Sequence, residues 1–117
     1  MVDVAVFRAL GDVNRLRVLQ LLFDGELCVC QVEKLLDMSQ PNVSRHLHKL
    51  RTAGLVEADR RGQWTYYRLS AYMEKQGADL VRYLQSNTFQ DPLFVQDRML
   101  MHQARQEDRL ICDEETA

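Results

Sequence analysis

The segment from residue 39 to residue 52 carries a complete set of signals for one short helix. Ser39 offers an oxygen that can cap a helix start, and Pro41 falls in the first turn, where its missing N–H costs no hydrogen bond. One face of this helix is apolar at helical spacing and carries Val43, Leu47 and Leu50. The sequence therefore predicts a helix with one face in a core and the other free for contacts.

A β-hairpin pattern follows this helix. Residues 53–55 end the helix, and Val56 to Arg60 and Gln63 to Leu69 read as two strands around a turn at Arg61-Gly62. Three helix-spaced apolar segments come earlier, at residues 2–10, 12–24 and 28–36. This order predicts a mainly α fold with a β-hairpin wing, the winged helix-turn-helix, in which the later helix reads the major groove and the wing touches the DNA backbone.

Charge is distributed unevenly along the chain, although the 117 residues sum to a formal net charge of −2. Residues 39–68 carry six Lys and Arg against two Asp and Glu, whereas residues 86–117 carry three against seven. A basic surface thus belongs to the predicted helix and hairpin, and an acidic one to the C-terminal end. Local charge of this kind favours binding to the phosphates of double-stranded DNA.

The polar face of the predicted helix and the hairpin turn supply the candidate DNA contacts. Arg45 is the strongest, because a guanidinium can bind a base edge through two hydrogen bonds. His46 lies nearer the apolar face, so a structural hydrogen bond is expected at least as much as a base contact. The full candidate set is Ser39, Gln40, Asn42, Ser44, Arg45, His48, Lys49, Arg60, Arg61 and Gln63.

Two cysteines, Cys28 and Cys30, lie at the predicted start of the helix over residues 28–36. Three cysteines without a secretory signal favour metal binding or redox sensing over a structural disulfide, and a helix start favours the thiolate form. Residues two apart point about 200° away from each other on a regular helix, so both thiolates reach one soft ion only if the first turn distorts. Cys112 is the candidate third donor; the alternatives are an oxygen, nitrogen or exogenous thiol donor, or a two-thiolate complex.

Several motifs together resemble one family, the ArsR/SmtB repressors, and their arsenic-responsive members in particular. The match covers roughly residues 4–85, and it rests on residues 7–12, 15–17, 26–30, 39–47 and 50–56. The resemblance implies a winged-helix homodimer that binds operator DNA and leaves it when As(III) or Sb(III) is bound by cysteine thiolates. In the members with the most similar thiol motif a third cysteine follows the second by three residues, and that position is Glu33 here.

The C-terminal third predicts a dimer contact and an extension. An apolar stripe at helical spacing, joined by the first helix, is expected to form a two-fold interface; it comprises Met73, Gly77, Leu80, Val81 and Leu84. A polar helix is then expected from Asp91-Pro92 to about Arg109. We expect residues 1–86 to form the DNA-binding and dimerisation domain, and residues 87–117 a helical extension with an acidic tail.

Other functions compete with the metalloid repressor. The main alternative is a redox or persulfide sensor of the same fold, in which Cys28 or Cys30 links to Cys112. An enzyme that uses a Cys nucleophile is not expected, because the sequence has no Gly-rich phosphate loop and no His, Asp or Glu constellation beside the thiols. No organic cofactor is expected either. A paired zinc or cadmium site is disfavoured because residues 70–86 contain no histidine. His102 is a weak candidate ligand.

Without a long apolar span or signal peptide, we expect a cytoplasmic protein with no membrane partner.

Overall fold

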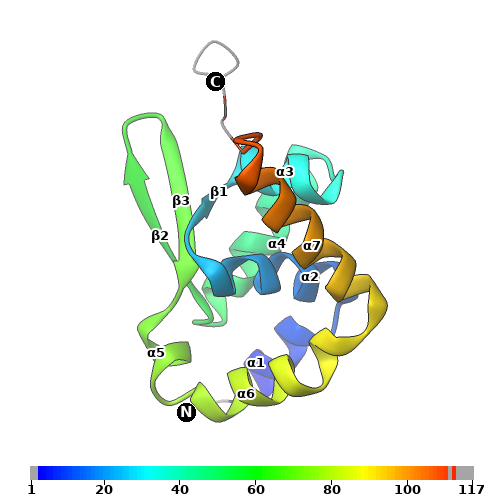
Figure 1. The fold of residues 1–117 in the computed structure, drawn as a ribbon. Coiled ribbons are helices and arrows are strands. Elements are labelled where there is room, and N and C mark those ends of the chain that lie inside the picture. Colours follow the sequence, from blue (N-terminus) through cyan, green and yellow to red (C-terminus); the bar gives the residue numbers. More distant parts are fainter. Residues whose placement is uncertain (1–2, 111, 113–117) are drawn as a thin grey trace.

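The computed structural model describes residues 3–110 and 112, and it shows a helical body with a small antiparallel sheet at one side (Figure 1). The elements in chain order are α1 (Asp3–Leu10), α2 (Val13–Leu21), η1 (Leu22–Asp24), β1 (Leu27–Cys28), α3 (Val29–Leu36), α4 (Gln40–Thr52), β2 (Val56–Arg61), β3 (Trp64–Leu69), α5 (Ala71–Glu74), α6 (Ala78–Ser86), η2 (Thr88–Gln90) and α7 (Pro92–Gln106). The predicted winged helix-turn-helix order is confirmed.

Helix α4 forms as its sequence signals predict. The Ser39 side chain caps the helix by accepting a hydrogen bond from the Asn42 backbone N–H at 3.4 Å, and Pro41 lies in the first turn. The three predicted core residues are fully buried: they are Val43, Leu47 and Leu50. Helix α2 begins with a similar cap, because the Asp12 carboxylate accepts from the Arg15 backbone N–H at 3.0 Å. Local capping and one apolar face therefore fix α4 on the body.

The wing is the β2–β3 hairpin, and β1 adds a third strand in the order β1-β3-β2. Arg61 pairs with Trp64, so the turn is Gly62-Gln63 and the predicted turn at Arg61-Gly62 is wrong by one residue. Gly62 has a φ of 62°, a left-handed value that glycine adopts without a Cβ clash, and this sets the turn. Gln63 therefore belongs to the turn, and not to the second strand as predicted.

The predicted dimer stripe is wrong in part, because the chain buries some of it within the subunit. Met73 is fully buried and Leu84 is 4% exposed, and both belong to the subunit's own core. The helix also breaks between α5 and α6, where Gly77 packs so closely on Met73 that a Cβ at Gly77 would lie 3.0 Å from the Met73 Cα. The exposed large apolar side chains on α1, α2 and α6 are instead Val4, Phe7, Val13 and Tyr83.

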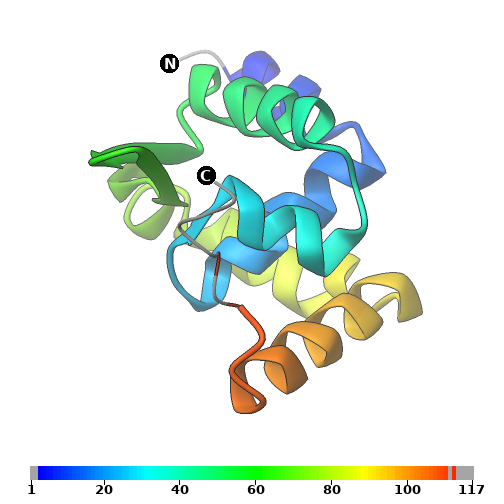
Figure 2. The same ribbon diagram turned by 90° about the horizontal axis from the view of Figure 1, so that it is seen from above.

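Helix α7 packs across α2 and α3 (Figures 1 and 2). The prediction of a polar helix is wrong for its inner face, which buries Phe94, Met101 and Ala104. Asp97 is also buried there and forms a two-pronged ion pair with Arg17 of α2, at 2.8 and 3.1 Å. The helix ends at Gln106, three residues before the predicted end.

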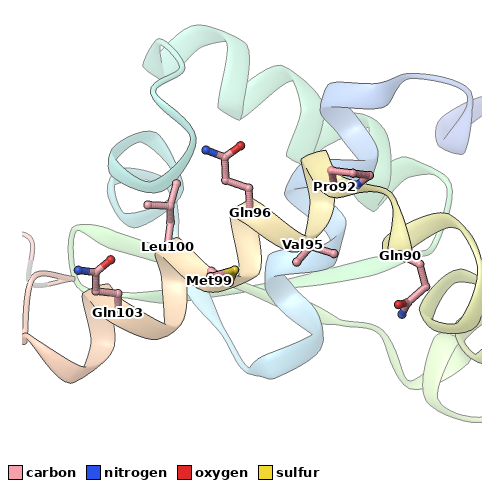
Figure 3. A pocket seen from close by; sticks show the side chains of 7 residues that line it. All are labelled: Gln90, Pro92, Val95, Gln96, Met99, Leu100 and Gln103. Atoms are coloured by element: carbon pink, nitrogen blue, oxygen red, sulfur yellow. The ribbon is translucent and has the colours of Figure 1, made fainter.

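The outer face of α7 lines a surface pocket of about 420 Å³, where Val95, Met99 and Leu100 lie among glutamines (Figure 3). Asp113, Glu114 and Glu115 of the predicted acidic tail lie outside the described residues. No helix in the described part of the chain is both long and apolar enough to cross a membrane.

Candidate functional site

The sulfur atoms of all three cysteines gather in one place. The Sγ atoms of Cys28, Cys30 and Cys112 all lie within 4.8 Å of one another. Cys30 and Cys112 are joined as a disulfide with their Cα atoms 6.3 Å apart, and the free thiol of Cys28 lies 3.8 Å from the Cys112 sulfur. The structure therefore brings Cys112 to the pair within a single subunit.

Cys28 and Cys30 come together without any distortion of a helix. Cys28 is the N-cap of α3 and the last residue of β1, with extended backbone angles (φ −93°, ψ 167°). The regular helix begins only at Val29, so the 200° separation of residues two apart does not apply to this pair. The expectation that the first turn must distort is therefore wrong. The strand β1 was missing from the prediction because its two residues are defined only by pairing with β3.

Cys112 reaches the site because α7 leads back towards the start of α3. After α7 the backbone turns at Asp108, which has a φ of 57°. Leu110 then enters the core with 8% of its surface exposed, and Cys112 follows two positions later. His102 is exposed on α7 and is not a member of the sulfur cluster.

A charged pair connects the thiol strand to the wing. Glu26 directly precedes β1, and its carboxylate accepts two hydrogen bonds from the Arg61 guanidinium, at 2.5 and 2.8 Å. Arg61 also pairs with Asp59 at 3.0 Å and lies 4.7 Å above the Tyr66 ring. The hydrogen bond from Arg61 lowers the pKa of Glu26 and, reciprocally, the pKa of Arg61 is raised. The sequence did not reveal this pair, because its members are 35 positions apart.

The predicted DNA-contacting side chains of α4 lie on its solvent-facing side. Gln40, Asn42, Arg45, His48 and Lys49 are exposed, as is the capping residue Ser39, and Ser44 is half-buried. Gln40 donates to the Ser44 hydroxyl at 3.0 Å, and Arg45 donates to the side-chain Oδ1 of Asn42 at 2.7 Å. In the wing, Arg60 is exposed and donates to the Gly62 backbone carbonyl at 2.9 Å. The solvent-facing side of α4 and the wing remain the predicted DNA interface.

His46 lies on the other side of α4 and is only 5% exposed. Burial lowers the pKa of His46, and although Asp12 acts to raise it, Arg15 acts to lower it further. Burial on the core side of α4 disfavours a base contact by His46. The expected structural hydrogen bond is not found at its Nδ1, which is buried and has no hydrogen-bond partner among the described residues.

This burial predicts a loss of stability in acid. Because the pKa of His46 is lowered on folding, the unfolded chain takes up the proton first as the pH falls below about 6.5. The unfolded state then binds more protons, so the free energy of unfolding is expected to fall between that pH and the lowered pKa. Urea unfolding at pH 7.5 and 5.5 measures the fall. The fall in the free energy of unfolding should be smaller in His46→Gln and unchanged in the exposed control His102→Gln. If His46→Gln shows the same fall as the wild type, this account is contradicted.

Comparison with known proteins identifies the family. The pattern described as "Bacterial regulatory protein, arsR family" matches residues 12–58. The chain is also 40% identical over 82 residues to the arsenical resistance operon repressor of Escherichia coli K12, a match that covers 69% of this chain and 70% of that protein. The chain belongs to the ArsR family. Its members are transcriptional regulators and not enzymes.

Other members of the ArsR family extend this comparison. The arsenic resistance transcriptional regulator ArsR1 of Pseudomonas putida is 51% identical over 65 residues, which are 55% of this chain and about half, 51%, of that relative. Among solved structures, HlyU of Vibrio cholerae has a TM-score of 0.60 and 34% identity over 69% of this chain and 88% of its own. The homodimeric winged helix-turn-helix domain of Mb0332 from Mycobacterium bovis has a TM-score of 0.62 and 32% identity over 73% and 79% of the two chains.

Proposed function

We propose that this ArsR-family protein is a metalloid-responsive repressor, which binds operator DNA as a homodimer and is released when As(III) or Sb(III) binds Cys28, Cys30 and Cys112. The convergence of the three sulfurs within 4.8 Å carries the proposal. The names of the relatives from P. putida and E. coli, both arsenic resistance regulators, support it. In this proposal residues 1–86 bind DNA and dimerise, and residues 87–117 supply the third ligand.

The chemistry of three thiols suits a soft, three-coordinate ion. Each thiol that displaces a hydroxide from As(OH)₃ forms one As–S bond and releases one water, so three cysteines replace all three hydroxides. The Cys30–Cys112 disulfide must first take two electrons and two protons from a thiol reductant, which is itself oxidised to a disulfide. Among the described residues the cluster contains these three donors and no fourth His, Asp or Glu, a set that favours As(III) or Sb(III) over a tetrahedral zinc site.

Titration of operator release is the direct test of this function. Reduced protein on its operator is exposed in turn to As(III), Sb(III), Cd(II), Zn(II) and a persulfide donor, with DNA binding followed by fluorescence anisotropy. We expect release by As(III) and Sb(III) at lower concentrations than by Cd(II) or Zn(II). Release by the persulfide donor alone would reject the metalloid function in favour of the second candidate.

That second candidate is a thiol redox or persulfide sensor, and the Cys30–Cys112 disulfide is the observation that favours it. In such a sensor the oxidised and reduced forms differ in operator affinity without any ion. Equal operator affinity of the two forms removes this candidate.

The DNA interface is proposed to centre on Arg45. Its guanidinium is exposed on the solvent-facing side of α4, among polar side chains of the kind that a recognition helix presents to a major groove. Arg45→Ala is expected to weaken operator binding by about 1–3 kcal/mol, and to flatten the dependence of affinity on salt, if Arg45 binds a base edge through two hydrogen bonds. Anisotropy titrations at several salt concentrations measure both effects. Arg105→Ala, on α7, is the control; unchanged affinity in Arg45→Ala places the reading face elsewhere.

A further inference from the structure

The side chain of Gln31 spans the two chain segments that carry the cysteines. Its Oε1 accepts a hydrogen bond from the backbone N–H of Cys28 at 2.9 Å. Its Nε2 donates to the backbone carbonyl of Leu110 at 2.7 Å, two residues before Cys112. One half-buried amide is thus bonded to both sides of the sulfur cluster.

Only a side chain with both an acceptor and a donor can make this pair of bonds. The Cys28 N–H can only donate and the Leu110 carbonyl can only accept, so the two partners fix which end of the amide faces which segment. A glutamate at position 31 keeps the acceptor for Cys28, as a capping residue does at this position of a helix, but it has no proton for Leu110. A methionine has a similar length and provides neither strong bond.

We infer that Gln31 is a positioning residue, which holds the arm formed by residues 107–110 and Cys112 so that Cys112 faces Cys28 and Cys30. Besides the Cys30–Cys112 disulfide, two non-covalent contacts hold the arm near its end: the buried side chain of Leu110, and the hydrogen bond from Gln31 to the Leu110 carbonyl. Burial of Leu110 fixes where the arm meets the body. The hydrogen bond fixes the direction in which the backbone leaves Leu110, and this direction decides where Cys112 points.

The placement of Cys112 can be measured without any metalloid. Two glutathione molecules reduce the Cys30–Cys112 disulfide to two free thiols and form one glutathione disulfide. The equilibrium constant of this reaction gives the effective concentration of one protein thiol at the other. A Cys28→Ser background leaves only these two cysteines, and serine retains a capping oxygen at residue 28. We expect Gln31→Glu and Gln31→Met each to lower this effective concentration about 5- to 10-fold, because both variants lose the hydrogen bond to the Leu110 carbonyl, the one bond by which Gln31 holds the arm.

The matched control is Gln96→Glu, the same change on the outer face of α7 (Figure 3). Gln96 is exposed, and we expect no change in effective concentration for it. Because Gln31→Met adds no charge, a decrease in both Gln31 variants excludes repulsion between a carboxylate and the thiolates as the cause. Thermal unfolding of each reduced variant reports whether α3 and α7 remain packed. If both Gln31 variants equal the parent protein in effective concentration, the inference is overturned.

A second measurement joins this inference to the proposed function, on which its metalloid part rests. We expect Gln31→Glu to weaken As(III) binding by the reduced protein about 5- to 10-fold, and to have no further effect once Cys112 is replaced by serine. An equal loss in the presence and absence of Cys112 overturns the positioning role. If the parent protein binds no As(III) while the disulfide equilibrium shifts as expected, the proposed function fails and the positioning role stands.

Discussion

Cys28→Ser and Cys30→Ser proteins are expected to stay on operator DNA at As(III) concentrations that release the wild type. Each substitution replaces one of three soft sulfur donors by a hydroxyl, which is neutral at pH 7 and binds As(III) poorly. We expect the As(III) concentration for half-release to rise at least about 100-fold, equivalent to about 2.7 kcal/mol of lost binding. Anisotropy titration of reduced protein on its operator measures this concentration.

The same substitutions are expected to leave operator affinity nearly unchanged. Cys28 is buried at the N-cap of α3, where a serine is a favoured capping residue, so the start of the helix is retained. Cys30 is half-buried in the first turn, and loss of its sulfur removes little core packing. Operator affinity without As(III) is therefore the internal control for folding. Cys112→Ser should raise the half-release concentration too, because Cys112 belongs to the same cluster. Release of both Cys28→Ser and Cys30→Ser at the wild-type As(III) concentration contradicts the proposed site.

The sulfur cluster lies between two elements of the predicted DNA interface, α4 and the wing, so a change at the cluster can affect both. Helix α3 packs directly on α4, whose cap Ser39 is nine positions after Cys30. On the other side, Cys28 pairs with Tyr66 of the wing strand β3, and Glu26 holds Arg61. In the proposed mechanism, an ion that draws Cys28, Cys30 and Cys112 together shifts both α4 and the wing. We expect such an ion to bind a form with low operator affinity better than the DNA-bound form, and a coupling of about 1–3 kcal/mol is typical of this linkage.

Helix α4 could be predicted from the sequence because its signals are local. The cap at Ser39, the proline at the first turn and the apolar face all lie within fourteen residues, and the structure confirms each of them. The hairpin was also predicted, although its turn was displaced by one residue. A turn depends on which residue takes a left-handed φ, and the single glycine of this hairpin, Gly62, fits a turn in either register.

Contacts between distant segments could not be predicted in the same way. The strand β1 exists only because β3 pairs with it, and Cys112 lies 82 positions from Cys30 along the chain. The contact between Cys112 and Cys30 depends on the packing of α7 against the body, which the ion pair between half-buried Arg17 and buried Asp97, together with Phe94, stabilises. One local signal was missed: residues 28–31 have the Cys-x-x-Gln spacing of a capping pair, which indicates a bond between Gln31 and the helix cap Cys28.

For the apolar stripe after the wing, the sequence predicted which residues are buried but not where they pack. Helical spacing indicates that Met73 and Leu84 are buried, but it does not say against which surface. The structure places both in the subunit's own core. The exposed apolar residues that remain on α1 and α6 lie at the end of the molecule away from the wing tip (Figure 1), and α1 was part of the predicted interface. The proposed dimer therefore rests on Val4, Phe7 and Tyr83 in place of most of that stripe.

Phe7→Glu is expected to disrupt this proposed dimer. Phe7 is 65% exposed in the subunit, a large aromatic surface that a two-fold partner would bury, and the homodimeric neighbour from M. bovis supports such a partner. A symmetric interface contains two copies of Phe7. The variant therefore loses the hydrophobic contribution of both side chains to the free energy of dimerisation, about 1.5 kcal/mol or more for each. We expect the dimer dissociation constant to rise at least about 100-fold, before any cost of the two added charges. Equilibrium sedimentation at micromolar concentrations measures the change.

Met99→Glu is the matched control for this experiment. Met99 is 66% exposed, nearly the same as Phe7, but it lies on the outer face of α7. If the dimer forms through α1 and α6, Met99→Glu should keep the wild-type dissociation constant while Phe7→Glu loses the dimer. Phe7→Glu should also lose operator affinity, because two half-sites about one helical turn apart are bound together only by a dimer. A wild-type monomer, or a dimer lost in Met99→Glu and retained in Phe7→Glu, shows that the interface is not formed by this end of the molecule.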